Sequence, residues 1–268
     1  MNEQMKSTPE GFTDIPFIYV FDGRSLTPGA DVNNLIVSIQ EDDFVLRSIA
    51  GMSTIADKWK YYDQAQMRVI SEFFATSNRW TVVPERMYQG NSQIKFDLQT
   101  VNLAANADGN DIAFAGFVGA KRVPNGKYAW VGYESDYPHW ERQFTYRIPI
   151  TLDFFVGDAS RQFSMEITDG DFELQTISIV RSDTPGDLIA DPFRITMFDP
   201  SGYNALSDKP CSPRWLNWIQ GNNWSSAFPA PTLVYPINSL IKFEIDSLLN
   251  AGTQTFDITV TGVERMPC

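Results

Sequence analysis

One eleven-residue stretch occurs twice in this chain, and it limits the possible folds more than any other feature. Residues 88–98 read YQGNSQIKFDL and residues 235–245 read YPINSLIKFEI, with six of the eleven positions identical. After each copy the chain reaches a glycine, Gly116 in the first and Gly262 in the second, and then a basic residue. A repeat at this spacing predicts that the two halves of the chain are copies of one structural unit.

The repeat extends into the earlier part of each half. DFVL at residues 43–46 aligns with DFEL at residues 171–174, 128 positions later, whereas the eleven-residue copies lie 147 positions apart. The difference predicts an insertion in the second half, which we place at residues 207–231. A weaker match aligns residues 60–63 with residues 196–199. The expected organisation is an N-terminal arm at 1–15, a first domain at 16–139 and a second domain at 140–268.

Alternating apolar and polar residues predict that both halves are built from short β-strands. In the repeat, Ile94, Phe96 and Leu98, like Ile241, Phe243 and Ile245, fall on one face and polar residues on the other, as expected for a strand with one buried and one wet face. Aromatic residues make up 13% of the chain and also favour sheets. Many short strands with regular turn signals are typical of a sandwich or barrel. We therefore predict an all-β protein of two tandem antiparallel β-sandwiches of jelly-roll type.

Three local patterns refine this prediction. Apolar residues at helical spacing predict a short helix near residues 63–75. Pro149 lies inside the longest alternating run and cannot donate to a ladder, so its strand should lie at an edge or carry a bulge. Residues 133–140 show no clean period and are the expected linker between the domains.

The charge of the chain limits its partners. A formal net charge of −12 argues against binding to a nucleic-acid backbone, which requires clustered Lys and Arg. No apolar run approaches the roughly 20 residues that span a bilayer, and the polar N-terminus does not resemble a signal peptide. We expect a protein made in a cytoplasm that binds neither nucleic acid nor membrane. Cys211 and Cys268 are expected as reduced thiols, with a bridge between them as the alternative.

The sequence offers little catalytic chemistry. His139 is the only histidine, and we expect it to be a partly exposed residue between the domains rather than part of a catalytic triad. Common nucleophile, phosphate-binding and zinc motifs do not occur in the sequence. Asp169 and Asp171 flank Gly170, and residues 42–43 are a second acidic pair at the equivalent place. A calcium loop or a glycosidase pair is the alternative to a structural turn. Because an active site seldom needs two copies, we expect turns, with no catalytic, cofactor or metal site.

The predicted insertion is the most informative candidate for a functional surface. Its aromatic residues stand among prolines and asparagines, and we predict that they form a protein interface: Trp215, Trp218, Trp224 and Phe228. Aromatic anchors in polar loops are typical of interface hot spots. A satellite core that covers one end of the second sandwich and a platform for carbohydrate are the alternatives.

Each half resembles the β-sandwich structural proteins of tailed-bacteriophage particles, especially head-decoration and related accessory proteins. The shared pattern comprises the acidic-Phe-x-Leu strand at 43–46 and 171–174, the Asp-Pro-Ser-Gly turn at 199–202, the Asn-Ser-x-Ile-x-Phe strand and a closing Gly-x-x-Arg/Lys. The second half fits best, over residues 144–266. The first half departs near residues 63–74, where Gln-Ala-Gln replaces Pro-Ser-Gly. The resemblance implies no catalytic or binding residues.

The resulting expectation is a non-enzymatic structural protein of a bacteriophage particle. We expect an accessory or decoration protein on the outer surface of the head, assembled as a homo-oligomer, with a trimer favoured, and bound to the major capsid protein or other virion proteins. A double-jelly-roll major capsid protein is one alternative. A carbohydrate- or host-receptor-binding fibre, neck or tail component is the other.

Overall fold

The computed structural model divides the chain into two compact units, one containing residues 17–123 and the other residues 124–268 with 11–16. This boundary precedes the one at 139 and 140 that the sequence predicts. Among the described residues, no helix is long and apolar enough to cross a membrane. The structure describes residues 8–22, 32–53, 57–62, 69–74, 79–100, 113–131, 137–153, 160–181, 193–216, 233–247 and 253–268.

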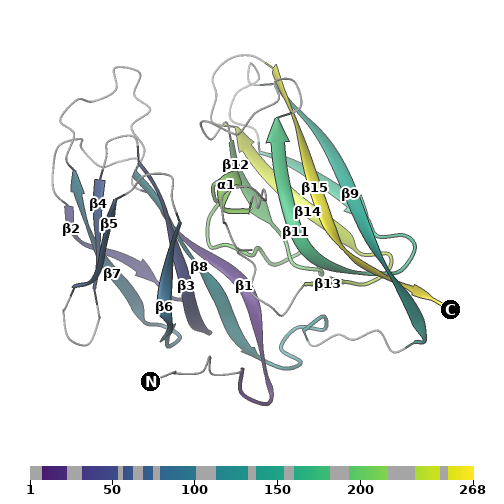
Figure 1. The fold of residues 1–268 in the computed structure, drawn as a ribbon, viewed down its shortest axis with the longest axis horizontal. Coiled ribbons are helices and arrows are strands. Elements are labelled where there is room, and N and C mark those ends of the chain that lie inside the picture. Colours follow the sequence, from purple (N-terminus) through teal and green to yellow (C-terminus); the bar gives the residue numbers. More distant parts are fainter. Residues whose placement is uncertain are drawn as a thin grey trace. The chain divides into compact units, whose positions relative to one another are not determined.

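The first eight strands form two sheets, with the orders β1-β8-β3-β6 and β2-β7-β4-β5 (Figure 1). The pairs β1·β8, β2·β7, β3·β6 and β4·β5 are nested in one another, as in one long hairpin rolled up on itself. This nested pairing of eight strands is the jelly roll. The strands are β1 Phe12–Asp22, β2 Val32–Ser38, β3 Asp43–Ser53, β4 Asp57–Tyr62, β5 Val69–Phe74, β6 Arg79–Tyr88, β7 Gln93–Thr100 and β8 Ala113–Pro124.

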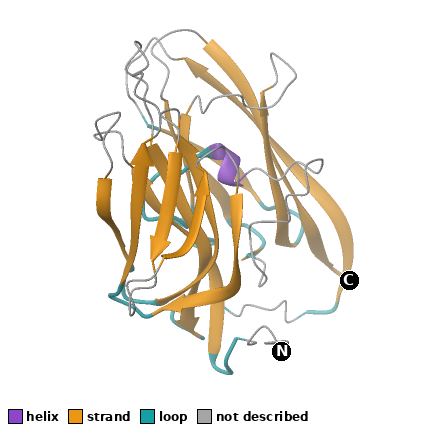
Figure 2. Cartoon of the chain, turned by 60° about the vertical axis from the view of Figure 1, so that its left-hand side comes forward, coloured by secondary structure: helices purple, strands orange, loops and turns teal. Residues whose placement is uncertain are grey.

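The second half repeats this arrangement. Its sheets have the orders β9-β15-β11-β13 and β10-β14-β12, which are the orders of the first half without a counterpart of β5 among the described residues. The all-β, tandem jelly-roll fold predicted from the sequence is therefore confirmed (Figure 2). The elements are β9 His139–Asp153, β10 Arg161–Glu166, β11 Asp171–Arg181, β12 Phe193–Met197, α1 Pro213–Leu216, β13 Val234–Tyr235, β14 Leu240–Ser247 and β15 Thr253–Pro267.

The edge of β12 that corresponds to the β5 side of β4 carries an isolated β-bridge. Cys211 forms an isolated bridge with Ile195 of β12, with both backbone N–H groups donating to the opposite carbonyls at 2.8 and 2.9 Å. The chain then enters α1, which contacts β11 of one sheet and β12 of the other. Because these strands belong to different sheets, α1 contacts both layers of the second sandwich.

The repeated stretch has the same role in both halves. Tyr88 lies opposite Phe44 on β3, and Tyr235 lies opposite Phe172 on β11. The turn before the repeated strand places an asparagine in the left-handed region in each copy, at φ 61° for Asn91 and 65° for Asn238. The apolar residues whose burial is described face the core as predicted: Ile94, Phe96, Ile241, Phe243 and Ile245.

The register corrects one part of the sequence alignment. Gly262 lies opposite Leu174, and its counterpart opposite Leu46 is Gly119, not Gly116. A Cβ added at Gly119 or Gly262 would lie 2.0 Å from a carbonyl oxygen of the neighbouring strand, so neither position has room for a side chain. Both glycines stand beside a β-bulge in the facing strand, which brings the backbones this close.

Two further predictions meet different outcomes. The helix predicted near residues 63–75 is wrong for Val69–Phe74, which is strand β5, paired with β4; residues 63–68 lie outside the described part. The pairing of β5 with β4 outweighs the helical spacing of the apolar residues in β5. The edge position predicted from Pro149 is confirmed, because β9 is the outermost strand of its sheet.

Candidate functional site

The predicted aromatic interface is described at one residue only. Trp215 lies in α1 and is 7% exposed, beside the buried Leu216. Its ring is therefore part of the packing of the second sandwich in this structure. Trp218, Trp224 and Phe228 lie outside the described residues, and for them the interface remains a prediction.

The turn that follows β12 is held together by one buried carboxylate. Asp199 is fully buried, and its Oδ1 accepts hydrogen bonds from Ser201 Oγ at 2.5 Å and the Asn204 backbone N–H at 3.3 Å. Its Oδ2 accepts from Asn204 Nδ2 and from Trp130 Nε1, both at 2.8 Å. Gly202 has φ +73° and closes the turn with an N–H donated to the Asp199 carbonyl at 2.8 Å. Four donors to one carboxylate fix the backbone of this turn.

The same turn carries the most exposed large hydrophobic side chain of the described chain. Tyr203 is 88% exposed, although the residues on either side of it form hydrogen bonds to Asp199. Lys242 lies beside it, with Nζ 3.4 Å from the Gly202 carbonyl oxygen and 4.7 Å from the centre of the Phe198 ring. The sequence identified the Asp-Pro-Ser-Gly turn but not this tyrosine, which directly follows the glycine.

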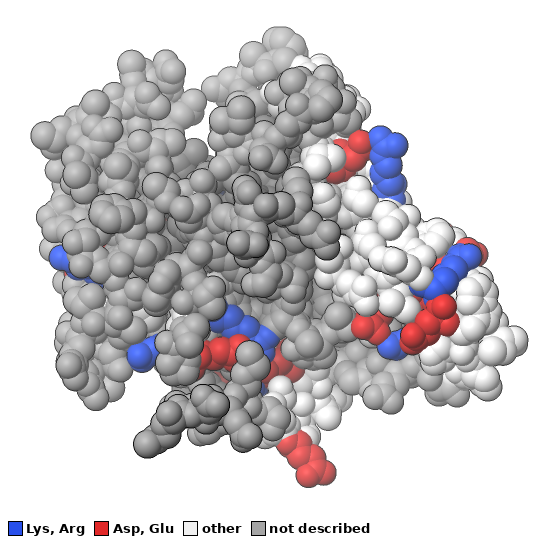
Figure 3. All heavy atoms as spheres, viewed as in Figure 1, with Lys and Arg blue, Asp and Glu red and all other residues white. Residues whose placement is uncertain are grey.

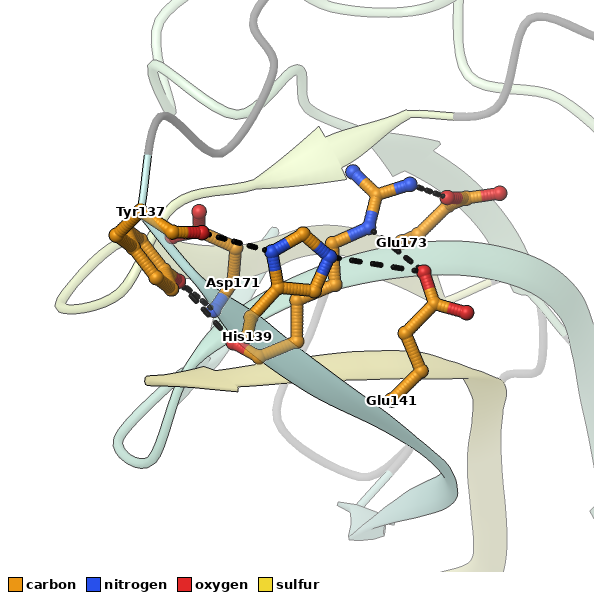
Figure 4. Close-up of polar contacts among 6 residues, drawn as sticks. Tyr137, His139, Glu141, Asp171 and Glu173 are labelled. Atoms are coloured by element: carbon orange, nitrogen blue, oxygen red, sulfur yellow. Dashed lines mark hydrogen bonds and ion pairs between the residues drawn. The ribbon is translucent and has the colours of Figure 1, made fainter. Parts of the chain in front are cut away.

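A cluster of polar side chains joins the first residues of β9 to β11 and to the end of β15 (Figure 4). The Tyr137 hydroxyl donates to the Arg265 carbonyl at 3.1 Å and accepts from the Asp171 N–H at 3.4 Å. The Glu141 carboxylate lies 3.5 Å from Arg265 Nε, and the Arg265 guanidinium also pairs with Glu173. The cluster therefore links three neighbouring strands.

His139 belongs to this cluster and is partly buried. Its Nδ1 lies 3.0 Å from the Tyr137 carbonyl oxygen and its Nε2 lies 3.8 Å from the Glu141 carboxylate. Neither of these two partners is a hydroxyl or thiol nucleophile. His139 is the first residue of β9 rather than part of a linker.

The repeated acidic residues also serve the backbone. The Asp43 carboxylate accepts the Gly90 N–H at 3.0 Å, and the Asp171 carboxylate accepts the Ile237 N–H at 2.9 Å. In each copy an aspartate at the start of a strand thus fixes the turn before the repeated strand. Asp169 is instead exposed and lies 3.4 Å from the Arg142 guanidinium. Within the described ranges, no group of three His, Cys, Asp or Glu residues could hold a metal ion.

An ion pair with one buried partner was not visible in the sequence. Glu264 on β15 is fully buried and accepts hydrogen bonds from Arg142 Nε at 2.7 Å and from the Tyr146 hydroxyl at 2.9 Å. Burial, reinforced by the Glu264 carboxylate, raises the pKa of the Tyr146 phenol above its ordinary value. The Arg142 guanidinium lies 4.8 Å from the centre of the Phe144 ring. These charges stabilise strand pairing between β9 and β15.

No protein-family model matches the sequence, and no curated protein matches it. Three solved structures similar to this chain come from viruses. One is a chain of Sulfolobus Turreted Icosahedral Virus, at 10% identity and a TM-score of 0.26, covering 98% of this chain and 62% of that one. Another is a chain of an archaeal virus described by its triple jelly roll fold and turret assembly, at 7% identity and a TM-score of 0.25, covering 96% of this chain and 60% of that one.

A third similar structure is a chain of infectious bursal disease virus, Gt strain, at 13% identity and a TM-score of 0.24, covering 96% of this chain and 73% of that one. The chain thus spans about three fifths of the first two virus proteins. Scores of this size place the chain in no family.

Proposed function

We propose that this chain is a non-enzymatic structural protein of a virus particle, acting as an accessory or decoration protein on the outer surface of the shell. The observation that carries the proposal is the repetition of the jelly-roll strand order in both halves of the chain, complete except for a counterpart of β5 among the described residues. Jelly rolls are frequent in viral capsid proteins, and two similar domains in one chain can present similar surfaces to neighbouring subunits.

The use of charged groups supports a structural role. Asp43, Asp171 and Asp199 bind backbone or side-chain donors of turns, and Glu264 and Arg265 join neighbouring strands. On the face drawn in Figure 3, acidic and basic residues of the described chain lie next to one another rather than in a patch of one sign. Carboxylates occupied in this way stabilise the fold and are poorly placed for general acid or base catalysis.

The net charge supports an outer location. A chain of −12 would be repelled by packaged nucleic acid, whereas negative charge on the outside of a particle favours solubility. In this proposal the chain forms a homo-oligomer, with three chains supplying six similar domains around a six-fold position, and its partner is the major capsid protein. The assignment to a bacteriophage rather than to another virus rests on the sequence resemblance alone.

A double-jelly-roll major capsid protein is the second candidate. The shared strand pairing favours it, because both halves keep one four-stranded sheet of the same order, β1-β8-β3-β6 in the first half and β9-β15-β11-β13 in the second. Such a protein would build the shell itself rather than cover it. The two candidates predict different numbers of copies of this chain in the particle. They also differ in whether a closed shell forms when the chain is missing.

The test is quantitative mass spectrometry of purified particles, together with particles produced without this gene. A decoration protein should be present in fixed stoichiometry and be labelled by a membrane-impermeant amine reagent, and closed shells should form without it. If no shell forms without the chain and it is the most abundant virion protein, it is the major capsid protein. Particles that lack the chain altogether would contradict both candidates.

A further inference from the structure

On one sheet of the first unit, an exposed methionine lies beside an arginine. Met87 belongs to β6 and Arg122 to β8, and β3 runs between these two strands. Met87 lies opposite Val45 of β3, and Arg122 lies opposite Asp43, two residues earlier on the same strand. Because side chains alternate along a strand, all four point away from the core-facing side chain of Phe44. The two residues therefore share the outer face of this sheet.

The guanidinium of Arg122 is directed at the sulfur of Met87. Arg122 Nη1 donates to Met87 Sδ at 3.7 Å, and the methionine side chain is 59% exposed. A thioether sulfur is a weak acceptor, whereas a guanidinium carries N–H donors in a planar fork that suits oxygen acceptors. The contact thus pairs a strong donor with a weak acceptor. An oxygen atom bound to this sulfur would be a better partner for the same donor.

Met87 also differs from the other methionines in its access to solvent. The chain has eight methionines, and among those whose burial the structure describes Met87 is the most exposed. Met197, on β12, is 2% exposed. Peroxides oxidise a methionine that they can reach, and the product is methionine sulfoxide. The contrast between Met87 and Met197 therefore predicts selective oxidation within the folded chain.

We propose that Met87 is a site of reversible oxidation by peroxides and that Arg122 binds the oxidised side chain. In this reaction a sulfur lone pair attacks one oxygen of hydrogen peroxide, a sulfur–oxygen bond forms, and the oxygen–oxygen bond breaks. The second oxygen takes up a proton and leaves as water. The sulfur loses two electrons and the peroxide gains them, so the reaction needs no further reagent. A methionine sulfoxide reductase reverses the change.

The position of Arg122 determines what the oxidation does to the fold. Oxidation usually disrupts a methionine that is packed in a core, because the product is polar. Here the sulfoxide oxygen would form beside a charged donor, and a hydrogen bond to a charged group is about twice as strong as a neutral one. That bond would join β6 to β8 across β3. The inference concerns the chain itself and does not depend on the proposed structural role.

The first experiment treats the folded full chain with hydrogen peroxide and follows each methionine by peptide mass spectrometry. We expect Met87 to be oxidised at least about tenfold faster than Met197, because access controls the reaction. In a chain unfolded in urea the two rates should become similar, which shows that the fold causes the difference. A methionine sulfoxide reductase should restore the original mass of the Met87 peptide. Equal rates at Met87 and Met197 in the folded chain would overturn the proposal.

The second experiment tests Arg122 by comparing melting temperatures before and after peroxide treatment. M87L reports the effect of oxidising the remaining methionines, and subtracting its shift isolates the contribution of Met87. This contribution should be zero or positive in the wild type and more negative in R122Q, which lacks the charged donor. If R122Q does not fold, R122K, which keeps the charge but loses the planar fork, takes its place. Equal contributions with and without the arginine, or a clear loss of stability in the wild type, would contradict the proposal.

Discussion

Lys121 and Glu264 occupy the same position in the two jelly rolls and carry opposite charge. Lys121 on β8 lies opposite Phe44 of β3, and Glu264 on β15 lies opposite Phe172 of β11. In the first copy the ammonium lies 3.6 Å from the centre of the Phe17 ring, a cation–π contact at a partly exposed site. In the second copy the carboxylate is fully buried.

The aromatic framework around this position is unchanged between the copies. The rings of Phe17 and Tyr19 are 4.8 Å apart, as are those of Phe144 and Tyr146. Tyr19 meets Phe44 edge-on at 4.9 Å, and Tyr146 meets Phe172 edge-on at 5.0 Å. The two copies therefore have the same aromatic packing but opposite charges beside it. In the second copy, the Arg142 guanidinium neutralises the buried Glu264 carboxylate.

Glu264→Gln should be clearly destabilising. It leaves the Arg142 guanidinium, which is 34% exposed, beside a neutral amide. Removing one partner of a buried pair costs about 3 to 5 kcal/mol, and the partial exposure of Arg142 reduces this to about 2 kcal/mol. Urea unfolding of the full chain gives the measurement. Lys121→Gln is the matched control and should cost less than about 1 kcal/mol; equal losses from both variants would contradict the buried pair.

The sequence predicted the strands and the duplication because both depend on local pattern. Ile94 and Phe96 alternate with polar residues, and this period identifies a half-buried strand without further information. The equivalence of Gly119 and Gly262 could not be found in this way. The connection before the last strand differs in length between the copies, and an alignment of apolar patterns cannot locate that difference.

The candidate site was predicted less well for a related reason. Trp215 and Tyr203 are both aromatic residues in segments rich in Pro, Gly, Ser and Asn. Trp215 is 7% exposed and Tyr203 is 88% exposed, and contacts with strands distant in sequence decide which ring is covered. The pairing of Glu264 with Arg142, residues 122 positions apart, is likewise a property of the strand register, which no local pattern records.

Gly262→Ala and Gly119→Ala should both be strongly destabilising. The added Cβ would lie 2.0 Å from a backbone carbonyl oxygen and below 3.0 Å from a buried phenylalanine ring. Overpacking at such a site costs about 3 kcal/mol. Gly126→Ala is the control, because Gly126 has φ +81° but nothing within 4 Å of its Cβ position, so only backbone strain of about 1 kcal/mol is expected. Thermal unfolding should rank the three variants; a Gly126 variant as unstable as the others would refute the steric argument.

The two thiols should react at very different rates. Neither cysteine forms a disulfide; Cys211 is buried and Cys268 is exposed. A chromogenic disulfide reagent should modify one thiol of the native chain quickly and the second only on unfolding, because access controls the reaction. Cys268→Ser should remove the fast phase and keep the slow one. A native chain in which neither thiol reacts until a reductant is added would instead indicate a bridge.

One buried tyrosine, Tyr235, and one partly buried tyrosine, Tyr146, should make the fold sensitive to alkaline pH. Burial raises the pKa of Tyr146, helped by Glu264, and burial together with the Asp199 charge raises the pKa of Tyr235. Each folded pKa exceeds the unfolded value near 10, so the native state holds its phenolic protons more tightly. The stabilisation is complete below about pH 10 and is lost as the pH rises from there towards the folded pKa.

The free energy of unfolding should therefore fall as the pH rises above about 10, and absorbance at the phenolate band should show that these tyrosines ionise together with unfolding. Tyr146→Phe removes one titrating group and should flatten the fall, at the cost of an unsatisfied contact at Glu264. Tyr203→Phe is the control, because that side chain is 88% exposed, and this variant should leave the pH dependence of unfolding unchanged. A wild type and a Tyr146→Phe variant with the same slope against pH would show that Tyr146 does not couple ionisation to folding.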